Sequence, residues 1–391
     1  MSAALLGACD KYLKVAPKGT VLKKAKTPFI DEALLPDGQE PGDIQKGILA
    51  AEASSILMSL LYTARYARYD LLRPVCALAS MVSRWNVHCD RMFYRLMCYV
   101  QTTANEVYQI GFVGDALEQC TLRLYTDADL ASCRLTKKST TGVLLVLVGP
   151  NTWFPLQGVS TKQTAVSHSS TESELVAADH GLRREGIPML DLLELLAGYK
   201  FPFEQYGDNQ STITIIRTGV NNTMRHFARQ HGIDLEFIHS HAKSGLMQLG
   251  YCVTDRQCGD IFTKHCVDVS KWSRLLPQIG HYQLNAGPAP WSPKAKPMAV
   301  EPSAHSDAKA ASRRSSSRPM ADLSVQKKEK QKPNETVELE KRLQSLGALT
   351  KEPVGGPSAY CTSKGAPPCT AAPDLKAVSY THLTLPTTPY V

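Results

Sequence analysis

Four acidic residues stand where the sequence pattern changes from strand to turn or opens a helix. They belong to the motifs YTDAD, STESEL, GDNQS and CGDIFTK, and are Asp127, Glu174, Asp208 and Asp260. Carboxylates are the ligands that Mg²⁺ prefers. Two such ions, roughly 3.5–4 Å apart, can stabilise both the attacking and the leaving oxygen of a phosphodiester. The four acids therefore predict metal-dependent phosphodiester chemistry at one carboxylate cluster.

Five predicted strands carry the apolar pattern around these acids. Residues 120–128 alternate between apolar and polar side chains, whereas 140–149 form a nearly continuous apolar run, which is typical of a buried strand. A third strand, 151–159, follows after a turn, and Pro155 favours an edge or a bulge for it. The last two predicted strands are 203–208 and 246–253.

Helices are predicted between and after these strands. One opens with Ser170 or Thr171 as N-cap and carries the glutamate of STESEL in its first turn. Pro188 interrupts the pattern that follows, so 172–185 and 189–198 are predicted as two helices or one kinked helix. Three more helices are predicted at 209–219, 231–245 and 258–266. This order indicates a mixed α/β (α+β) fold in which helices flank a five-stranded mixed sheet.

The remaining chain falls into distinct parts. Residues 1–45 mix Pro, Gly and Lys without periodicity and are interpreted as a linker or the remnant of an upstream domain. Within 46–118 apolar residues recur every three or four positions, which predicts three helices. Residues 283–376 are rich in Pro, Ala, Ser, Lys and Arg, which is typical of a disordered basic tail, with one short amphipathic helix at 336–350. The last residues, 377–391, look like a translated sequencing adapter and are interpreted as an artefact.

The chain resembles the connection segment and ribonuclease H domain at the end of copia-type LTR retrotransposon Pol polyproteins. The motifs YTDAD, KKSTTG, STKQTAVSHSSTESEL, GDNQST and GDIFTK follow one another in that family's order. Upstream, SLLY, LLRPV and SR match the family's connection segment, also in order. The resemblance implies that 46–118 is the helical reverse-transcriptase connection segment and that 119–282 has the ribonuclease H-like fold, in a truncated copy of the polyprotein.

This resemblance also implies an activity. It is the metal-dependent endonucleolytic hydrolysis of the RNA strand of RNA–DNA hybrids, with the hybrid as partner. The four acids would be catalytic and would hold two Mg²⁺ ions, with Mn²⁺ as the alternative. No YxDD-type polymerase motif occurs in the sequence. A reverse transcriptase domain is therefore expected as a further partner that this chain lacks.

Two of the acids have competitors nearby. Glu172 precedes Glu174 by two residues and lies on another face of the helix, so only one of them can be a principal ligand. SELVAA is the closer match to the family's pattern, which favours Glu174. Asp255 is the alternative to Asp260, and Asp129 is interpreted as structural. Each acid also has a simpler interpretation as a solvated or helix-capping carboxylate.

Polar residues beside the acids are the predicted substrate-binding groups. Ser170 and Thr171 precede the glutamate, and Asn209 and Gln210 follow Asp208. By resemblance they face the minor groove of the hybrid, where contacts to 2′-OH groups distinguish RNA from DNA. Plain N-capping is the other interpretation of Ser170 and Thr171.

Three other functions are considered. A catalytically inactive, retrotransposon-derived nucleic-acid-binding module would have an incomplete carboxylate set, and here the set is complete. An integrase-like strand transferase would need a glutamate at a set distance after Asp208, where Ser244 stands. A structural or assembly protein would use the predicted helix at 336–350 for association.

Composition argues against a membrane protein and against a secreted protein. No apolar run approaches the roughly 20 residues of a membrane span, and no basic residue precedes the short apolar stretch at the N-terminus. The eleven cysteines are scattered, and Cys252, Cys258 and His265 lack the second ligand pair of a zinc site. An intracellular protein, cytoplasmic or nuclear and without a membrane partner, is expected. Most of the net charge of +8 lies after residue 282. The globular part therefore has little general attraction for phosphate and must bind nucleic acid through individual polar side chains in fixed positions and through metal ions.

Overall fold

The computed structural model describes residues 1–31, 45–133, 135–221, 224 and 226–283. All of these belong to one compact unit. The predicted tail with its helix at 336–350, and the segment 377–391, lie outside the described residues except for Gln283.

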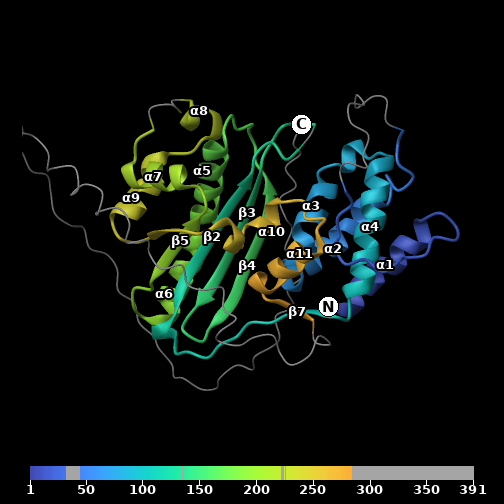
Figure 1. The fold of residues 1–391 in the computed structure, drawn as a ribbon, viewed down its shortest axis with the longest axis horizontal. Helices are drawn as coiled ribbons and strands as arrows, with labels where there is room; N and C mark the ends of the chain where they lie inside the picture. The colour runs from blue at the N-terminus through green and yellow to red at the C-terminus, as the bar shows by residue number, and fades with distance from the viewer. Residues whose placement is uncertain (32–44, 134, 222–223, 225, 284–391) are drawn as a thin grey trace, which may run out of the picture. The chain divides into compact units, whose positions relative to one another are not determined.

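A five-stranded mixed sheet forms the centre of the described structure (Figure 1). Its order is β4-β3-β2-β5-β6. The strands β2, β3 and β4 pair antiparallel, whereas β5 pairs parallel to both β2 and β6. The bounds are β2 Thr121–Asp129, β3 Thr140–Val148, β4 Trp153–Lys162, β5 Phe203–Gly207 and β6 Gln248–Tyr251. The predicted five-stranded mixed sheet is confirmed.

Pro155 explains why β4 lies at the edge. The register of β3 and β4 shifts beside this residue, because Leu145 pairs with Gln157 whereas Val146 pairs with Pro155. A proline cannot donate a ladder hydrogen bond, so it is tolerated on an edge strand or at a bulge. Both parts of the prediction for this strand are confirmed.

One face of the sheet is covered by the helices that follow β4 and β5 (Figure 1). They are α5 Ser170–His180, α6 Ile187–Ala197, α7 Gln210–Thr218, α8 Phe227–His231 and α9 Leu235–Lys243. A π-helical turn, Gly181–Gly186, joins α5 to α6 without a break. Pro188 has no N–H to donate, and a wider turn just before it accommodates the missing bond. Of the two predicted alternatives, two helices or one kinked helix, the continuous helical segment agrees with the second.

The helix predicted at 231–245 is present as α9, but it starts later, at Leu235, and the separate helix α8 before it was not predicted. The chain makes α8 and α9, separated at Gly232, whose φ of +65° ends the first helix in the left-handed region. Asp234 then caps α9 by accepting a hydrogen bond from the Glu236 N–H. A left-handed glycine followed by an aspartate cap ends one helix and starts the next.

The other face packs against the N-terminal helices and the last two helices of the described chain (Figure 1). The helices there are α1 Ser2–Val15, α2 Ala53–Ala67, α3 Leu72–Ala79, α4 Val87–Thr103, α10 Asp260–Thr263 and α11 Val269–Leu275. The three helices predicted within 46–118 are α2, α3 and α4. Two short strands that were not predicted, β1 Val107–Gln109 and β7 His281–Gln283, pair antiparallel. None of the described helices has the length and apolar content needed to cross a bilayer.

Residues 1–45, interpreted as a linker or the remnant of an upstream domain, begin with a packed helix, which does not fit a linker at this end. Ser2–Val15 is a helix whose side chains Leu5, Cys9 and Tyr12 are buried. They join the same apolar cluster as Phe262 and Trp272. Burial of this apolar face, rather than a capping side chain, holds the helix in place, because no side chain caps its N-terminus.

A fragment that begins at residue 119 is expected to fold poorly. Tyr125, Phe262 and Trp272 are buried in a cluster shared with α1, α2 and α4, and removing those helices would expose this apolar surface. Thermal unfolding of 119–283 compared with 1–283 tests this. A cooperative transition of the short fragment at nearly the same temperature would contradict the expectation.

Candidate metal centre

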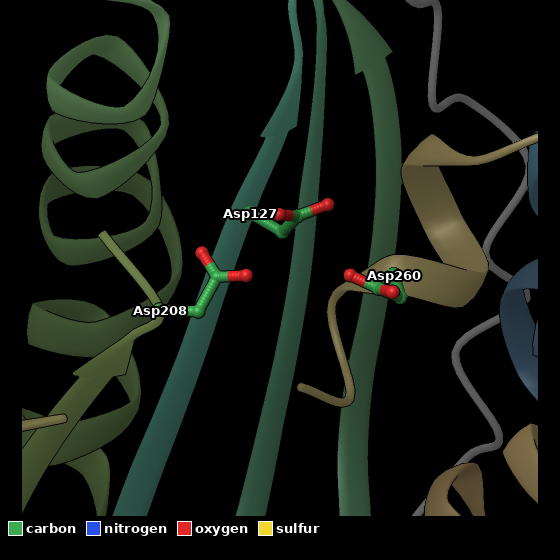
Figure 2. A group of neighbouring side chains, drawn as sticks. All are labelled: Asp127, Asp208 and Asp260. Carbon is green, nitrogen blue, oxygen red and sulfur yellow. The ribbon is translucent and has the colours of Figure 1, made fainter. Parts of the chain in front are cut away.

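Three aspartates from distant parts of the chain converge beside the sheet. Asp127, Asp208 and Asp260 each offer a carboxylate oxygen, and these oxygens lie within 4.8 Å of one another. Figure 2 shows the three carboxylates around a common space. Among the described residues they are the one group of acids, histidines and cysteines with the spacing of a metal site. Oxygen donors alone suit Mg²⁺ or Mn²⁺ better than zinc, so the donor set fits the predicted ions.

Strand pairing brings the first two aspartates together. Tyr125 of β2 is the partner of Tyr206 in the parallel strand β5, so Asp127 and Asp208 follow two residues later on adjacent strands. Side chains at the carboxyl ends of adjacent parallel strands share one edge of a sheet, where ligands commonly bind. Asp208 is half-buried and accepts a hydrogen bond from Thr254 Oγ1 at 3.1 Å.

Two glycines let the third aspartate approach. A Cβ on Gly259 would lie 2.6 Å from the Cβ of Asp127, and one on Gly142 would lie 2.7 Å from the carbonyl oxygen of Gly259. Real Cβ atoms do not pack so closely, so any side chain at either position would push α10 away from the sheet. Asp260, the first residue of α10, is thereby held beside β2.

Gln257 fixes the turn that leads into α10. Its Nε2 donates to the carbonyl of Thr126 at 3.0 Å, and its Oε1 accepts from the N–H of Gly259 at 3.2 Å. The side chain is fully buried, so both bonds are made away from water and are costly to lose. Sequence reasoning missed Gln257, because one of its two partners, Thr126, lies on a strand 131 residues earlier in the chain.

Glu174 adjoins the three aspartates. Its Oε1 accepts a hydrogen bond from the N–H of Ala128 at 3.2 Å, which anchors the carboxylate next to Asp127. Glu174 is not a member of the group within 4.8 Å. The structure thus brings three of the four predicted acids together and places the fourth beside them.

The competing acids face elsewhere. The carboxylate of Glu172 accepts from the N–H of His168 at 2.8 Å and lies 2.7 Å from Nε2 of buried His231 and 3.3 Å from Nε2 of His226. It ties the start of α5 to α8. Asp255 is exposed on the turn before α10.

The predicted substrate-binding residues lie at the starts of α5 and α7 and differ in exposure. Ser170 and Gln210 are exposed. Asn209 Oδ1 accepts from the N–H of Thr212 and so caps α7. The N-cap of α5 is Ser169, which accepts from the Glu172 N–H. The prediction of Ser170 or Thr171 as the cap was therefore wrong by one or two residues.

The zinc alternative has no support in the geometry. His265 Nε2 lies 2.6 Å from the carbonyl oxygen of Ile30. The thiols of Cys252 and Cys258 donate to nearby backbone carbonyls. These three residues do not form a metal group among the residues that the structure describes.

Burial and mutual repulsion make the cluster hard to ionise. Burial, with a further contribution from Asp260, raises the pKa of Asp127 to about 7, although Lys264 opposes the shift. Burial, together with Asp127 and Asp208, raises the pKa of Glu174 to about 9. Burial also raises the pKa of Asp260. Without metal, Asp127 and Glu174 therefore retain protons near neutral pH, and a divalent ion that binds their carboxylates must displace these protons.

Stabilisation by Mg²⁺ is expected to grow with pH. The folded-state pKa values of Asp127 and Glu174 are raised to about 7 and about 9. Without metal, the contribution of these two groups to folding stability is therefore complete below their unfolded pKa of about 4 and is lost as pH rises through the two folded-state values. An ion that binds the ionised carboxylates recovers this loss. Thermal unfolding with Mg²⁺ and with EDTA should show a larger difference at about pH 8.5 than at about pH 6. An equal difference at both pH values would contradict the assignment of these acids as ligands.

Comparison with known proteins relates part of the chain to a retroelement. Over 237 residues, 58% of the chain, it is 27% identical to the retrovirus-related Pol polyprotein from transposon TNT 1-94 of Nicotiana tabacum. The matched region makes up 16% of that polyprotein, so the chain spans only a small part of this relative's length. No family model and no solved structure matches the chain. The chain is thus distantly similar, over part of its length, to the retrovirus-related Pol polyprotein of a plant transposon.

Proposed function

We propose that this chain is the ribonuclease H-like part of a retrotransposon Pol protein and cleaves the RNA strand of RNA–DNA hybrids with divalent metal ions. The observation that carries the proposal is the convergence of Asp127, Asp208 and Asp260 within 4.8 Å. These acids come from three motifs far apart in the chain, and they are three of the four that the resemblance assigns as catalytic.

The order of elements supports the same fold. Three antiparallel strands are followed by a helical segment (α5 and α6), the strand β5, three helices (α7, α8 and α9), the strand β6 and the short helix α10, which agrees with the alternation of helices and strands expected for a ribonuclease H-like domain. The acids lie at the carboxyl ends of the central parallel strands β2 and β5 and at the start of α10. This is the edge of a mixed sheet at which a ligand is most often bound.

The chain's own residues would present oxygen ligands in a fixed arrangement. Thr263 donates to Asp127, the N–H of Ala128 donates to Glu174, and Thr254 donates to Asp208. Two Mg²⁺ ions, or Mn²⁺ in their place, would when bound supply an activated water and stabilise charge on the phosphate. Exact placement of the carboxylates matters because this stabilisation depends on preorganised groups.

Recognition of the hybrid is assigned to the polar residues around the cluster. Ser170 and Gln210 are exposed at the starts of α5 and α7 and are proposed to contact 2′-OH groups of the RNA strand. Thr171 and Asn209 contribute to the same surface; Asn209 holds the start of α7, and the carbonyl of Thr171 accepts from Thr212. A reverse transcriptase domain, absent from this chain, would supply the hybrid.

Cleavage of a labelled hybrid by the full chain tests the proposal. With Mg²⁺ or Mn²⁺ the RNA strand of the hybrid should be cut internally, and EDTA should stop the reaction. The same RNA as a single strand, and a DNA duplex of the same sequence, are the matched controls and should stay intact. Absence of cutting by folded protein that binds Mn²⁺ would refute the activity.

A catalytically inactive hybrid-binding module is the second candidate. It is favoured by one observation, the contact of both Asp260 oxygens with lysines: Lys264 Nζ at 2.6 Å from Oδ1 and Lys271 Nζ at 3.9 Å from Oδ2. Hybrid binding that persists in EDTA, without cleavage in Mg²⁺ or Mn²⁺, would distinguish this candidate from the enzyme.

A further inference from the structure

A lysine contacts one of the clustered carboxylates. Lys264 follows α10 directly and is four residues after Asp260, and its Nζ lies 2.6 Å from Asp260 Oδ1. The side chain of Asp260 is 2% exposed and that of Lys264 is 32% exposed. The helical turn of α10 fixes this approach, because residues four apart on a helix face one another. The ammonium is thus held against Asp260 by the same element that places this aspartate.

The cluster needs positive charge when no metal is bound. Asp127 and Asp260 are both buried, and their oxygens lie within 4.8 Å of each other and of Asp208. Buried carboxylates without a cation or a proton are strongly disfavoured. The ammonium of Lys264 supplies one such charge at hydrogen-bond distance. Lys271 is farther away, with Nζ 3.9 Å from Asp260 Oδ2 and a side chain that is 43% exposed.

An ammonium and a divalent ion compete for the same carboxylate. A protonated lysine has three donors and no lone pair, so it cannot ligate a metal. Two cations a few ångströms apart in a partly buried site repel each other strongly. The lysine stem is flexible and reaches solvent, so the ammonium can leave Asp260 without any movement of α10.

We propose that Lys264 occupies the cation position at Asp260 in the metal-free centre and that a divalent ion binds there by displacing its ammonium. The inference rests on the proposed role of the cluster as a metal centre. It makes Lys264 the residue that sets how tightly the centre holds its metal. Removing the ammonium therefore tightens metal binding and destabilises the metal-free protein.

The affinity of the full chain for Mn²⁺, measured by isothermal titration calorimetry, tests this with three variants. Lys264→Met keeps the length of the side chain and removes the charge, and it should bind Mn²⁺ at least roughly tenfold more tightly. Lys264→Arg keeps the charge and should bind nearly as the unaltered protein does. Lys271→Met removes a formal charge from the more distant lysine and should have a clearly smaller effect. Unchanged or weaker binding by Lys264→Met would overturn the proposal.

A second measurement uses the unaltered protein and does not depend on the folding of a variant. Acetylation of lysines by an activated ester, followed by peptide mass spectrometry, should label Lys264 faster with Mg²⁺ than with EDTA, with Lys271 as the internal reference. Equal or slower labelling of Lys264 in Mg²⁺ would contradict displacement. If the protein binds no divalent ion, both this inference and the proposed enzyme fail. If it binds metal by displacement but cuts no hybrid, only the proposed enzyme fails.

Discussion

Replacing Asp208 with asparagine is expected to abolish cleavage of the hybrid. The change keeps the shape of the side chain and an oxygen that can accept from Thr254, but it removes one of the three negative charges that converge within 4.8 Å. Loss of one preorganised charge-stabilising group commonly lowers kcat by on the order of 10²–10³-fold, and loss of a metal ligand adds to that effect. Because Asp208 is half-buried and lies after β5 rather than within it, the fold should tolerate the change.

Asp255→Asn is the matched control for this variant. Asp255 is exposed on the turn before α10 and was the sequence-based competitor of Asp260. Its replacement removes the same charge from the same side of the molecule but should leave cleavage nearly unchanged. Cleavage by Asp208→Asn at the unaltered rate, with Mn²⁺ still bound, would show that Asp208 is not part of the reacting centre.

The central sheet and the positions of Asp127 and Asp208 could be predicted because the information is local. Each acid follows an apolar strand, and the pairing of β2 with β5 then places the two side chains on adjacent strands. The predicted order of strands and helices was sufficient for this step, because neighbouring parallel strands end at the same edge.

The sequence, through its resemblance, placed Asp260 in the cluster, but the contacts that hold it there could not be predicted. Its approach depends on Gly142 and Gly259, which leave no Cβ between α10 and β2, and on Gln257, whose hydrogen bonds reach the backbone of Thr126. Each of these residues looks like an ordinary turn or strand residue in the sequence. Their importance arises from contacts across more than a hundred residues of chain, which no local pattern records.

The role of Lys264 could not be predicted from the sequence for a different reason. The sequence GDIFTK shows a lysine four residues after the aspartate, which on a helix indicates an ion pair of small energetic effect at a surface. Only the burial of Asp260 beside Asp127 turns that pair into a contact within a metal centre. The spacing of the two residues was visible in the sequence, but its importance could be judged only from the tertiary structure.

Replacing Asp70 with asparagine is expected to destabilise the whole described unit. Asp70 is fully buried and accepts two hydrogen bonds from the guanidinium of Arg68, at 2.9 and 2.7 Å, and one from Tyr99 Oη at 2.7 Å. His281, near the end of the described chain, places Nε2 3.2 Å from the same carboxylate. Breaking a buried pair by removing one partner typically costs about 3–5 kcal/mol. Denaturant unfolding should therefore show a large loss of stability, and Asp10→Asn on the exposed side of α1 should show almost none.

The pH dependence of this pair has a definite sign. Burial alone would raise the pKa of Asp70, but Arg68 and His281 hold it well below its usual range. A carboxyl with a lowered folded-state pKa contributes its full stability above its unfolded pKa of about 4, and the contribution falls as pH decreases below that value. The unaltered protein should therefore lose stability below about pH 4 more steeply than Asp70→Asn does. Parallel curves for the two proteins in that range would contradict the assignment.

A double variant, Asp70→Asn with Arg68→Met, separates two causes of the lost stability: the buried guanidinium without a counter-charge, and the missing contacts of the carboxylate. In Asp70→Asn the guanidinium of Arg68 stays buried, where it still donates to Thr103 Oγ1 at 2.7 Å but has lost its counter-charge. Adding Arg68→Met removes that buried charge, and because apolar groups often replace a buried ion pair at little cost, a large part of the lost stability should return. Among the described residues, the bonds of Asp70 go to Arg68, Tyr99 and His281 and not to the three clustered aspartates, so the double variant, once folded, should bind Mn²⁺ as the unaltered protein does. A double variant no more stable than Asp70→Asn would show that the loss comes from the missing carboxylate contacts with Tyr99 and His281 rather than from the buried charge.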